Sequence, residues 1–128
     1  MELASSKTTS SSKTWRLKLV QIENSGEVDE LTEQHYQEAL HEAAQMNGPD
    51  HPDVGEAASY LADLYMFLGR YQEAEILYRR ALKVYSNVFG EDHMIYSMAL
   101  RNLAEALQAR GKVTDAHRLR FQARGIFG

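Results

Sequence analysis

Apolar residues in the middle of the chain recur at the spacing of an amphipathic helix. After Pro52, which suits a first helical turn because its missing N–H is not needed there, they fall near positions i, i+3, i+4 and i+7. Gly69 interrupts the pattern, which resumes at Tyr71 and ends at Phe89-Gly90. Because the linker has only about three residues, the two helices must pack antiparallel. Their predicted buried faces comprise Val54, Ala57, Ala58, Leu61, Leu64, Tyr65, Leu68, Tyr71, Ala74, Leu77, Tyr78, Ala81, Leu82 and Tyr85.

The same pattern returns further along the chain, where His93 takes the place of His51 at an offset of 42 residues. A fixed period of this size indicates one helical unit that is copied and stacked, so that each copy buries its apolar face on its neighbour. We therefore predict an all-α protein, an α-solenoid of antiparallel helix pairs that closes at Gly125. Matching positions include Asp50 with Asp92, Ala57 with Ala99, Leu61-Ala62 with Leu103-Ala104, Gly69 with Gly111, Ala74 with Ala116 and Leu77 with Leu119. The third unit's predicted buried face comprises Tyr96, Ala99, Leu100, Leu103, Ala104, Leu107, Val113, Ala116 and Leu119.

Small residues recur where two helices of a pair should come close. Ala62 and Ala74 occupy these positions in the middle unit, and Ala104 and Ala116 occupy them in the next. We expect the tyrosines of the same faces to fill the space between the helices.

The chain before the middle unit carries a weaker form of the pattern. Residues 28–46 have helical spacing, and residues 15–22 form a dense apolar run that favours a helix but leaves a strand as an alternative. Residues 1–14 are rich in Ser, Thr and Lys, so we predict disorder there, or the cut edge of a longer parent protein. A transit peptide is a minor alternative, and an apolar secretory core is missing.

Taken together, the residues resemble a tetratricopeptide repeat. The positions that fill its pattern are Leu61, Ala62, Tyr65, Gly69, Tyr71, Ala74, Tyr78 and Ala81. The 42-residue period, with Gly48-Pro-Asp-His-Pro52 before the first helix and Glu73-Ala-Glu-Ile-Leu-Tyr-Arg-Arg-Ala-Leu82 in the second, is similar to the kinesin-light-chain type of these repeats. The resemblance implies one repeat domain over 15–128, with units of about 15–47 (degenerate), 48–89 and 90–125. Arg120 replaces the tyrosine of the last unit, as in a terminal helix that faces water.

Charge is unevenly distributed. No Lys or Arg lies between Leu19 and Gly69, a stretch with eleven Asp or Glu, whereas ten Lys or Arg and six acids follow from Arg70 onward. Copied helices with different solvated faces would produce this, as would a polarised rod that attracts a basic partner or stacks head to tail. The net charge of −4 gives no reason to expect nucleic acid, and no apolar run approaches the roughly 20 residues that span a membrane.

Motifs for catalysis or metal binding are weak. His41 starts a stretch in which Gln45 stands where a zinc motif needs its second histidine. His51 and His93 each follow an Asp at a predicted helix start, where we expect a capping role. With no phosphate loop, no nucleophile motif and no cysteine, we predict a cytoplasmic protein that is not an enzyme and holds no metal or cofactor.

The resemblance implies that the first helix of each pair lines a concave groove for a partner's peptide or helix. Asn102 is similar to the Asn by which related repeats hold a ligand's backbone, and Arg101 to half of a carboxylate clamp. Glu56 and Asp63 occupy sites where such a clamp would need Lys or Arg, and they predict a partner with a basic segment instead. The predicted groove residues are Glu56, Ser59, Tyr60, Asp63 and Phe67 in the middle unit and Met98, Arg101, Asn102, Glu105 and Gln108 in the third.

Two other functions fit the same pattern. Exposed repeat ends would allow copies to associate into a scaffold or a weak homo-oligomer. The repeats could also form the regulatory domain of a larger protein.

Overall fold

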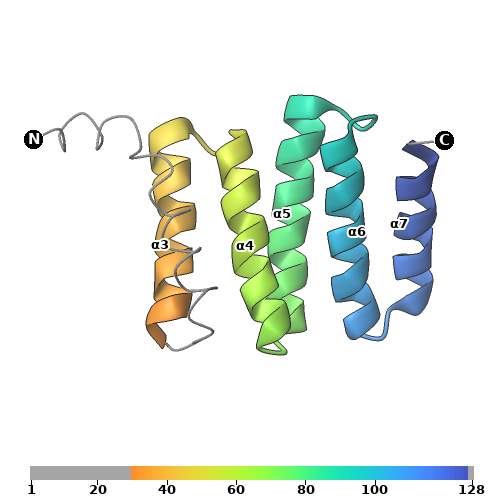
Figure 1. The fold of residues 1–128 in the computed structure, drawn as a ribbon, viewed down its shortest axis with the longest axis horizontal. Coiled ribbons are helices and arrows are strands. Elements are labelled where there is room, and N and C mark those ends of the chain that lie inside the picture. The colour runs from red at the N-terminus through yellow and green to blue at the C-terminus, as the bar shows by residue number, and fades with distance from the viewer. Residues whose placement is uncertain (1–29, 127–128) are drawn as a thin grey trace, which may run out of the picture.

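The fold is known from a computed structural model that describes residues 30–126. The predictions for residues 1–14 and 15–22 lie outside the described residues. Within residues 30–126, five helices follow one another in a row and alternate in direction (Figure 1). They are α3 (Glu30–Asn47), α4 (Pro52–Phe67), α5 (Tyr71–Phe89), α6 (Met94–Ala109) and α7 (Val113–Ile126). The predicted all-α solenoid is confirmed, and residues 30–126 contain no strand.

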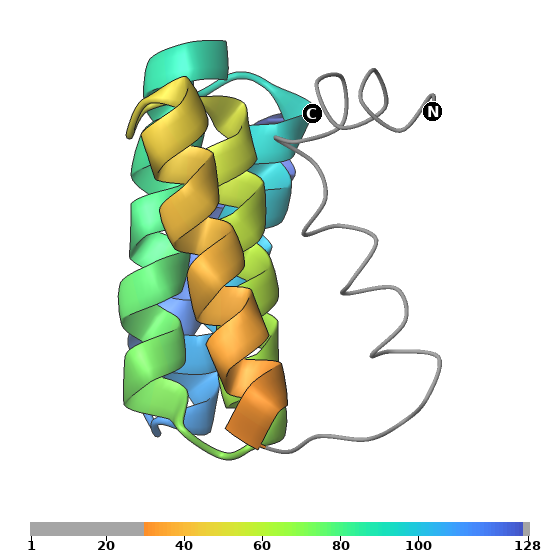
Figure 2. The ribbon, with the colours of Figure 1, turned by 90° about the vertical axis from the view of Figure 1, so that its left-hand side faces the viewer.

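Each helix packs mainly against its neighbour in the chain. Figure 2 shows α5 on one side of the molecule and α4 on the other, with α3 crossing in front of them. Thus α4–α5 and α6–α7 are the predicted helix pairs, and α3 takes the place of a second helix in the degenerate unit. Its Tyr36 and Ala39 are buried, as are Tyr78 and Ala81 of α5.

A glycine stands one or two residues after the last residue of each helix from α3 to α6. Gly48, Gly69, Gly90 and Gly111 have φ angles of +91°, +79°, +88° and +84°, which side chains with a Cβ rarely adopt. At the turn after α4 the Arg70 amide donates to the Tyr65 carbonyl at 2.8 Å, and the Gly69 amide donates to that of Met66. The turn after α6 repeats this pair of bonds, from the Lys112 amide to the Leu107 carbonyl and from the Gly111 amide to that of Gln108. A residue in the left-handed conformation therefore recurs in every turn between successive helices.

Histidine caps the start of both first helices, as predicted. The Asp53 amide donates to His51 Nδ1, and the Ile95 amide donates to His93 Nδ1, both at 3.0 Å. Each bond satisfies one of the N–H groups that a helix start leaves without a partner in the helix. The two repeats thus begin in the same way.

Removing one cap should have a measurable cost. His93→Ala should lower the free energy of unfolding by about 1 kcal/mol, the usual effect of losing a polar cap. Urea titration followed by circular dichroism measures it. His117→Ala is the matched control, since His117 is exposed within α7. Equal stability of the two variants would contradict a capping role.

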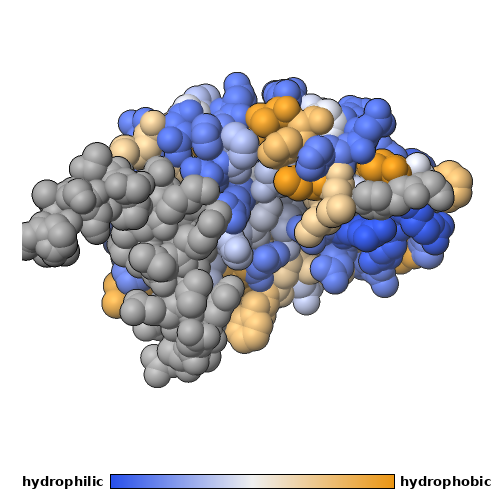
Figure 3. All heavy atoms as spheres, turned by 45° about the horizontal axis from the view of Figure 1, so that its top comes forward, coloured by the Kyte–Doolittle hydropathy of each residue, from blue (hydrophilic) through white to orange (hydrophobic). Residues whose placement is uncertain are grey.

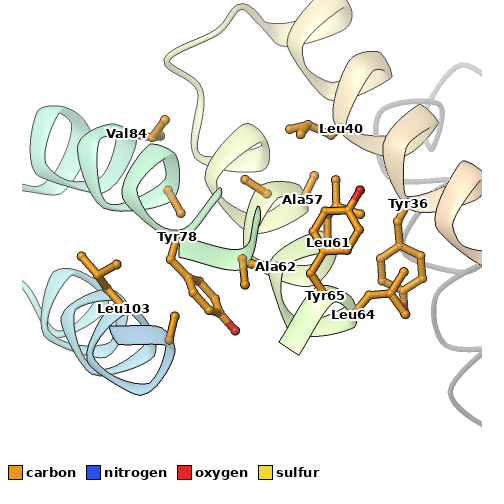
Figure 4. Packing of buried hydrophobic residues seen from close by; sticks show 14 of the residues in the cluster. Tyr36, Leu40, Ala57, Leu61, Ala62, Leu64, Tyr65, Tyr78, Val84 and Leu103 are labelled. Carbon is orange, nitrogen blue, oxygen red and sulfur yellow. The ribbon is translucent and has the colours of Figure 1, made fainter. Parts of the chain in front are cut away.

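The core is built from small and large residues in the predicted arrangement. Ala62, Ala74, Ala104 and Ala116 are fully buried, and Tyr65 and Tyr78 belong to the same cluster (Figure 4). The prediction was wrong at three helix ends: Leu68, Tyr71 and Val113 are 41%, 37% and 47% exposed. Each flanks a glycine turn, where the chain leaves the packed layer, so the buried stripe stops before the helical spacing does.

An ion-pair network ties α3 to the following pair. Arg70 donates two hydrogen bonds to the Glu33 carboxylate, at 2.8 and 3.1 Å, and also pairs with Glu73. The Tyr65 hydroxyl donates to Glu33 at 2.8 Å, and the Arg70 guanidinium lies 4.3 Å from the Tyr65 ring centre. The hydrogen bonds from Arg70, and then that from Tyr65, hold the pKa of Glu33 below its ordinary value. This end of the solenoid is therefore fixed by charge as well as by burial.

Candidate functional site

A hollow of about 420 Å³ lies between the first helices of the two pairs. α4 and α6 supply most of its walls, and two aromatic residues of α5 complete them. Its lining comprises Pro52, Asp53, Glu56, Ser59, Tyr60, Asp63, Tyr85, Phe89, Ile95, Met98, Ala99 and Asn102. We call it the acidic hollow, because its lining among residues 30–126 includes three carboxylates and no Lys or Arg.

The acidic hollow combines charge with apolar surface. Asp63 accepts a short hydrogen bond from the buried Tyr78 hydroxyl, which holds the carboxylate against the helix layer. Phe89, Ile95 and Met98 add apolar area, and Met98 is 54% exposed. In the space-filling view, apolar side chains form patches among hydrophilic ones (Figure 3). Such a surface suits a segment with both apolar and cationic groups.

Tyr85 reaches this hollow from the second helix of its pair. Gly55 of α4 makes room for it, since a Cβ at Gly55 would lie 2.7 Å from Cε1 of the tyrosine ring. Burial, and then the negative charge of Glu56, raises the pKa of Tyr85 to about 12. A hydrogen bond with Ser59 of α4, which also lines the hollow, opposes this rise of the pKa.

A second hollow, of about 400 Å³, adjoins the first and shares Asn102 with it. Its other lining residues are Arg101 and Glu105 of α6 and Arg120 and Arg124 of α7. We call it the basic hollow, because three guanidinium groups face one carboxylate. The two hollows thus give one groove two ends of opposite charge.

The structure brings most of the predicted groove residues together. Glu56, Ser59, Tyr60, Asp63, Met98 and Asn102 line the acidic hollow, and Arg101 and Glu105 line the basic one with Asn102. Phe67 and Gln108 line neither hollow. Phe67, the last residue of α4, is 75% exposed, and Gln108 accepts a hydrogen bond from Arg120.

Sequence reasoning missed the residues that second helices contribute, namely Tyr85, Phe89, Arg120 and Arg124. One signal was present for Tyr85: Gly55 inside a helical pattern marks a close approach by another group. For the arginines, the departure of Arg120 from the tyrosine pattern was read only as a sign of exposure to water.

The described part of the chain shows neither a metal site nor a membrane-spanning helix. Within residues 30–126, no group of three or more His, Cys, Asp or Glu side chains is arranged to hold a metal ion. No helix in the same range has the length and apolar character needed to cross a membrane.

Comparisons with known proteins agree with this architecture. The family model described as tetratricopeptide repeat matches residues 29–82 and 53–123. No curated protein matches the sequence. Among solved structures, the crystal structure of BtubC (BKLC) from P. vanneervenii is similar, with a TM-score of 0.69 and 24% sequence identity. The similarity covers 74% of this chain but only 38% of that protein, so it shows a shared fold and a chain that spans well under half of BtubC.

Proposed function

The chain belongs to the tetratricopeptide repeat family. We propose that its repeats are of the kinesin-light-chain type and that it binds a peptide or helix of a partner protein in the groove between α4 and α6. Repeats of this family indicate a scaffold for contacts between proteins. We propose further that the protein is cytoplasmic and that residues 15–128 form a single repeat domain.

The acidic hollow is the observation that carries the proposal. It is concave, it is lined by the first helices of successive repeats, and it mixes apolar side chains with a few polar groups. Glu56 and Asp63 favour a partner with Lys or Arg, because opposite charges raise the rate of encounter and disfavour acidic competitors. Asn102, at the junction of the hollows, offers an amide that can both donate to and accept from a peptide backbone.

Substitutions on α6 test the groove. Peptides enriched from a displayed random library on the full chain serve as probes, and fluorescence anisotropy measures their affinity. Asn102→Ala and Arg101→Ala should each weaken binding by about 0.5–1.5 kcal/mol, or roughly 2- to 13-fold, through loss of one hydrogen bond. Arg101 is exposed and Asn102 is half-buried outside the hydrophobic core, so melting curves should change little.

Two variants on α5 are matched controls. Asn87→Ala and Arg80→Ala remove the same side-chain types from exposed sites that line neither hollow, and should leave affinity unchanged. If the two α6 variants also bind normally, the binding surface lies outside the groove.

Self-association is a second candidate function, which the outer side of α7 favours. Phe121 is 72% exposed there, and Val113 is 47% exposed on the same helix. Static light scattering over a concentration series tests it. A mass that rises with concentration in the parent chain but not in Phe121→Ala would support assembly through this end, and a constant monomer mass would exclude it.

A further inference from the structure

We propose that the groove selects a segment of mixed charge, whose basic part lies in the acidic hollow and whose acidic side chain, Asp or Glu, lies in the basic hollow. The inference rests on the proposed function and deepens it, because it names the charge pattern of the partner. It concerns an anion subsite formed by Arg101, Arg120 and Arg124, which line the basic hollow together with Asn102 and Glu105.

The first support is the contrast between adjoining hollows. Within the described part of the chain, three carboxylates and no Lys or Arg line the acidic hollow, whereas three arginines and one glutamate line the basic one. Because Asn102 belongs to both, an extended segment that crosses the junction meets both charges in turn. A segment of one sign would be attracted at one end and repelled at the other.

The second support is that the basic hollow's arginines keep their charge available. Arg70, Arg79, Arg110 and Arg118 each form an ion pair with a carboxylate. Among residues 30–126, no carboxylate lies within 4.0 Å of Arg101, Arg120 or Arg124. Arg120 donates to the neutral amide of Gln108, and Arg124 lies 5.9 Å from the ring centre of Phe121. These cations can therefore accept a partner's carboxylate without first breaking an ion pair.

The third support comes from comparison of the two repeats. At the 42-residue offset, Arg120 and Arg124 stand where α5 has Tyr78 and Leu82. Tyr78 is buried and Leu82 packs against the cluster that contains Leu100 of α6. The equivalent positions of the second helix have thus changed from packed aromatic and aliphatic residues to two cationic ones that line the basic hollow. Any polar residue would suit a position that only faces water. Two arginines beside Arg101 also bring three guanidinium groups together, and the planar guanidinium group matches the geometry of a carboxylate.

A double-mutant cycle on the full chain tests the subsite. The probes are synthetic peptides enriched by the library selection described above, each with its acidic residues replaced in turn by Gln or Asn. Arg120→Gln/Arg124→Gln should weaken binding about three- to tenfold, the range of partly exposed charge pairs. The peptide change from Glu to Gln should produce a similar loss, and the two losses together should not add.

Arg118→Gln is the matched control, because Arg118 lies on the same helix, pairs with Asp115 and does not line the hollow. It should bind all probes as the parent does, and melting curves should show that every variant folds. The difference in affinity between the parent chain and Arg120→Gln/Arg124→Gln should become smaller as the salt concentration rises, because salt screens partly exposed charge pairs.

Three results would overturn the inference while leaving the proposed function in place. They are enriched peptides without any acidic residue, affinity that is unchanged in Arg120→Gln/Arg124→Gln, and dependence on a free C-terminal carboxylate instead of an acidic side chain, revealed by amidation. In each case binding would still respond to Asn102→Ala. Peptides indifferent to every groove substitution would instead contradict the proposed function itself.

Discussion

Replacing Leu103 with alanine should lower the free energy of unfolding by about 2–5 kcal/mol, the range for truncating a buried leucine. Leu103 is 1% exposed and lies in α6 beside Tyr78 of the preceding helix (Figure 4). Truncation removes apolar contacts and leaves a cavity that stacked helices can close only by shifting along their whole length. Because α6 packs against both α5 and α7, the loss should affect both interfaces.

The measurement is chemical denaturation followed by circular dichroism at the helical band. Met98→Ala is the control on the same helix: Met98 is 54% exposed, so its truncation should change stability by no more than about 0.5 kcal/mol. Met98→Ala should nevertheless weaken peptide binding, because Met98 lines the acidic hollow. A stable Leu103→Ala variant would mean that α6 does not pack on α5 through this residue.

Helical spacing predicted the repeat core well, because burial in a solenoid is periodic along the chain. The alanines at close-packed positions, the tyrosines between them and the capping histidines all follow from one unit and its copy. Spacing failed at Tyr71 and Val113, where helical period continues but the neighbouring helix no longer covers the side chain. Helical spacing therefore identifies the buried face of a helix. Where burial ends along that face depends on where the neighbouring helix stops covering it, next to the turns.

The groove could be predicted only in part, for a related reason. Residues of α4 and α6 were found because helical geometry separates their packed face from the opposite one. Tyr85 was assigned to the core by the same rule, yet it is long enough to reach the acidic hollow past Gly55. Arg120 and Arg124 became candidates only when the structure placed them opposite Arg101. The length that a side chain spans, and the meeting of side chains from different helices, depend on how the helices are placed in space. The spacing of residues along the chain does not contain this information.

The uneven charge of the chain also takes a more specific form in the structure. The sequence predicted an acidic stretch and a basic stretch without indicating what they face. In the fold, the acids of α4 line one hollow, and arginines of α6 and α7 line the next. Other charges of the same stretches serve packing: Glu75 is buried between Arg79 and Arg110, and Glu33 pairs with Arg70. The charge pattern therefore divides between holding the helices together and shaping the groove.

Ala74→Leu should lower the free energy of unfolding by about 1–3 kcal/mol through overpacking. Ala74 is fully buried near the start of α5, and Ala62, its predicted opposite across the α4–α5 interface, is fully buried as well. Three additional carbon atoms can be accommodated there only if the helices separate or neighbouring side chains leave their preferred rotamers. Separation would also strain the tight turn at Gly69, because that turn joins the same two helices.

Ala109→Leu is the matched control for this substitution. Ala109 is exposed at the end of α6, so the same added atoms meet solvent and should change stability by about 0.5 kcal/mol or less. Thermal and urea denaturation of both variants, followed by circular dichroism, gives the comparison. If Ala74→Leu unfolds at the same temperature and urea concentration as Ala109→Leu, the two helices of the pair do not meet at this alanine. The closest approach of α4 and α5 would then lie elsewhere along their interface. In that case Tyr85 of α5 would also lie differently relative to the acidic hollow.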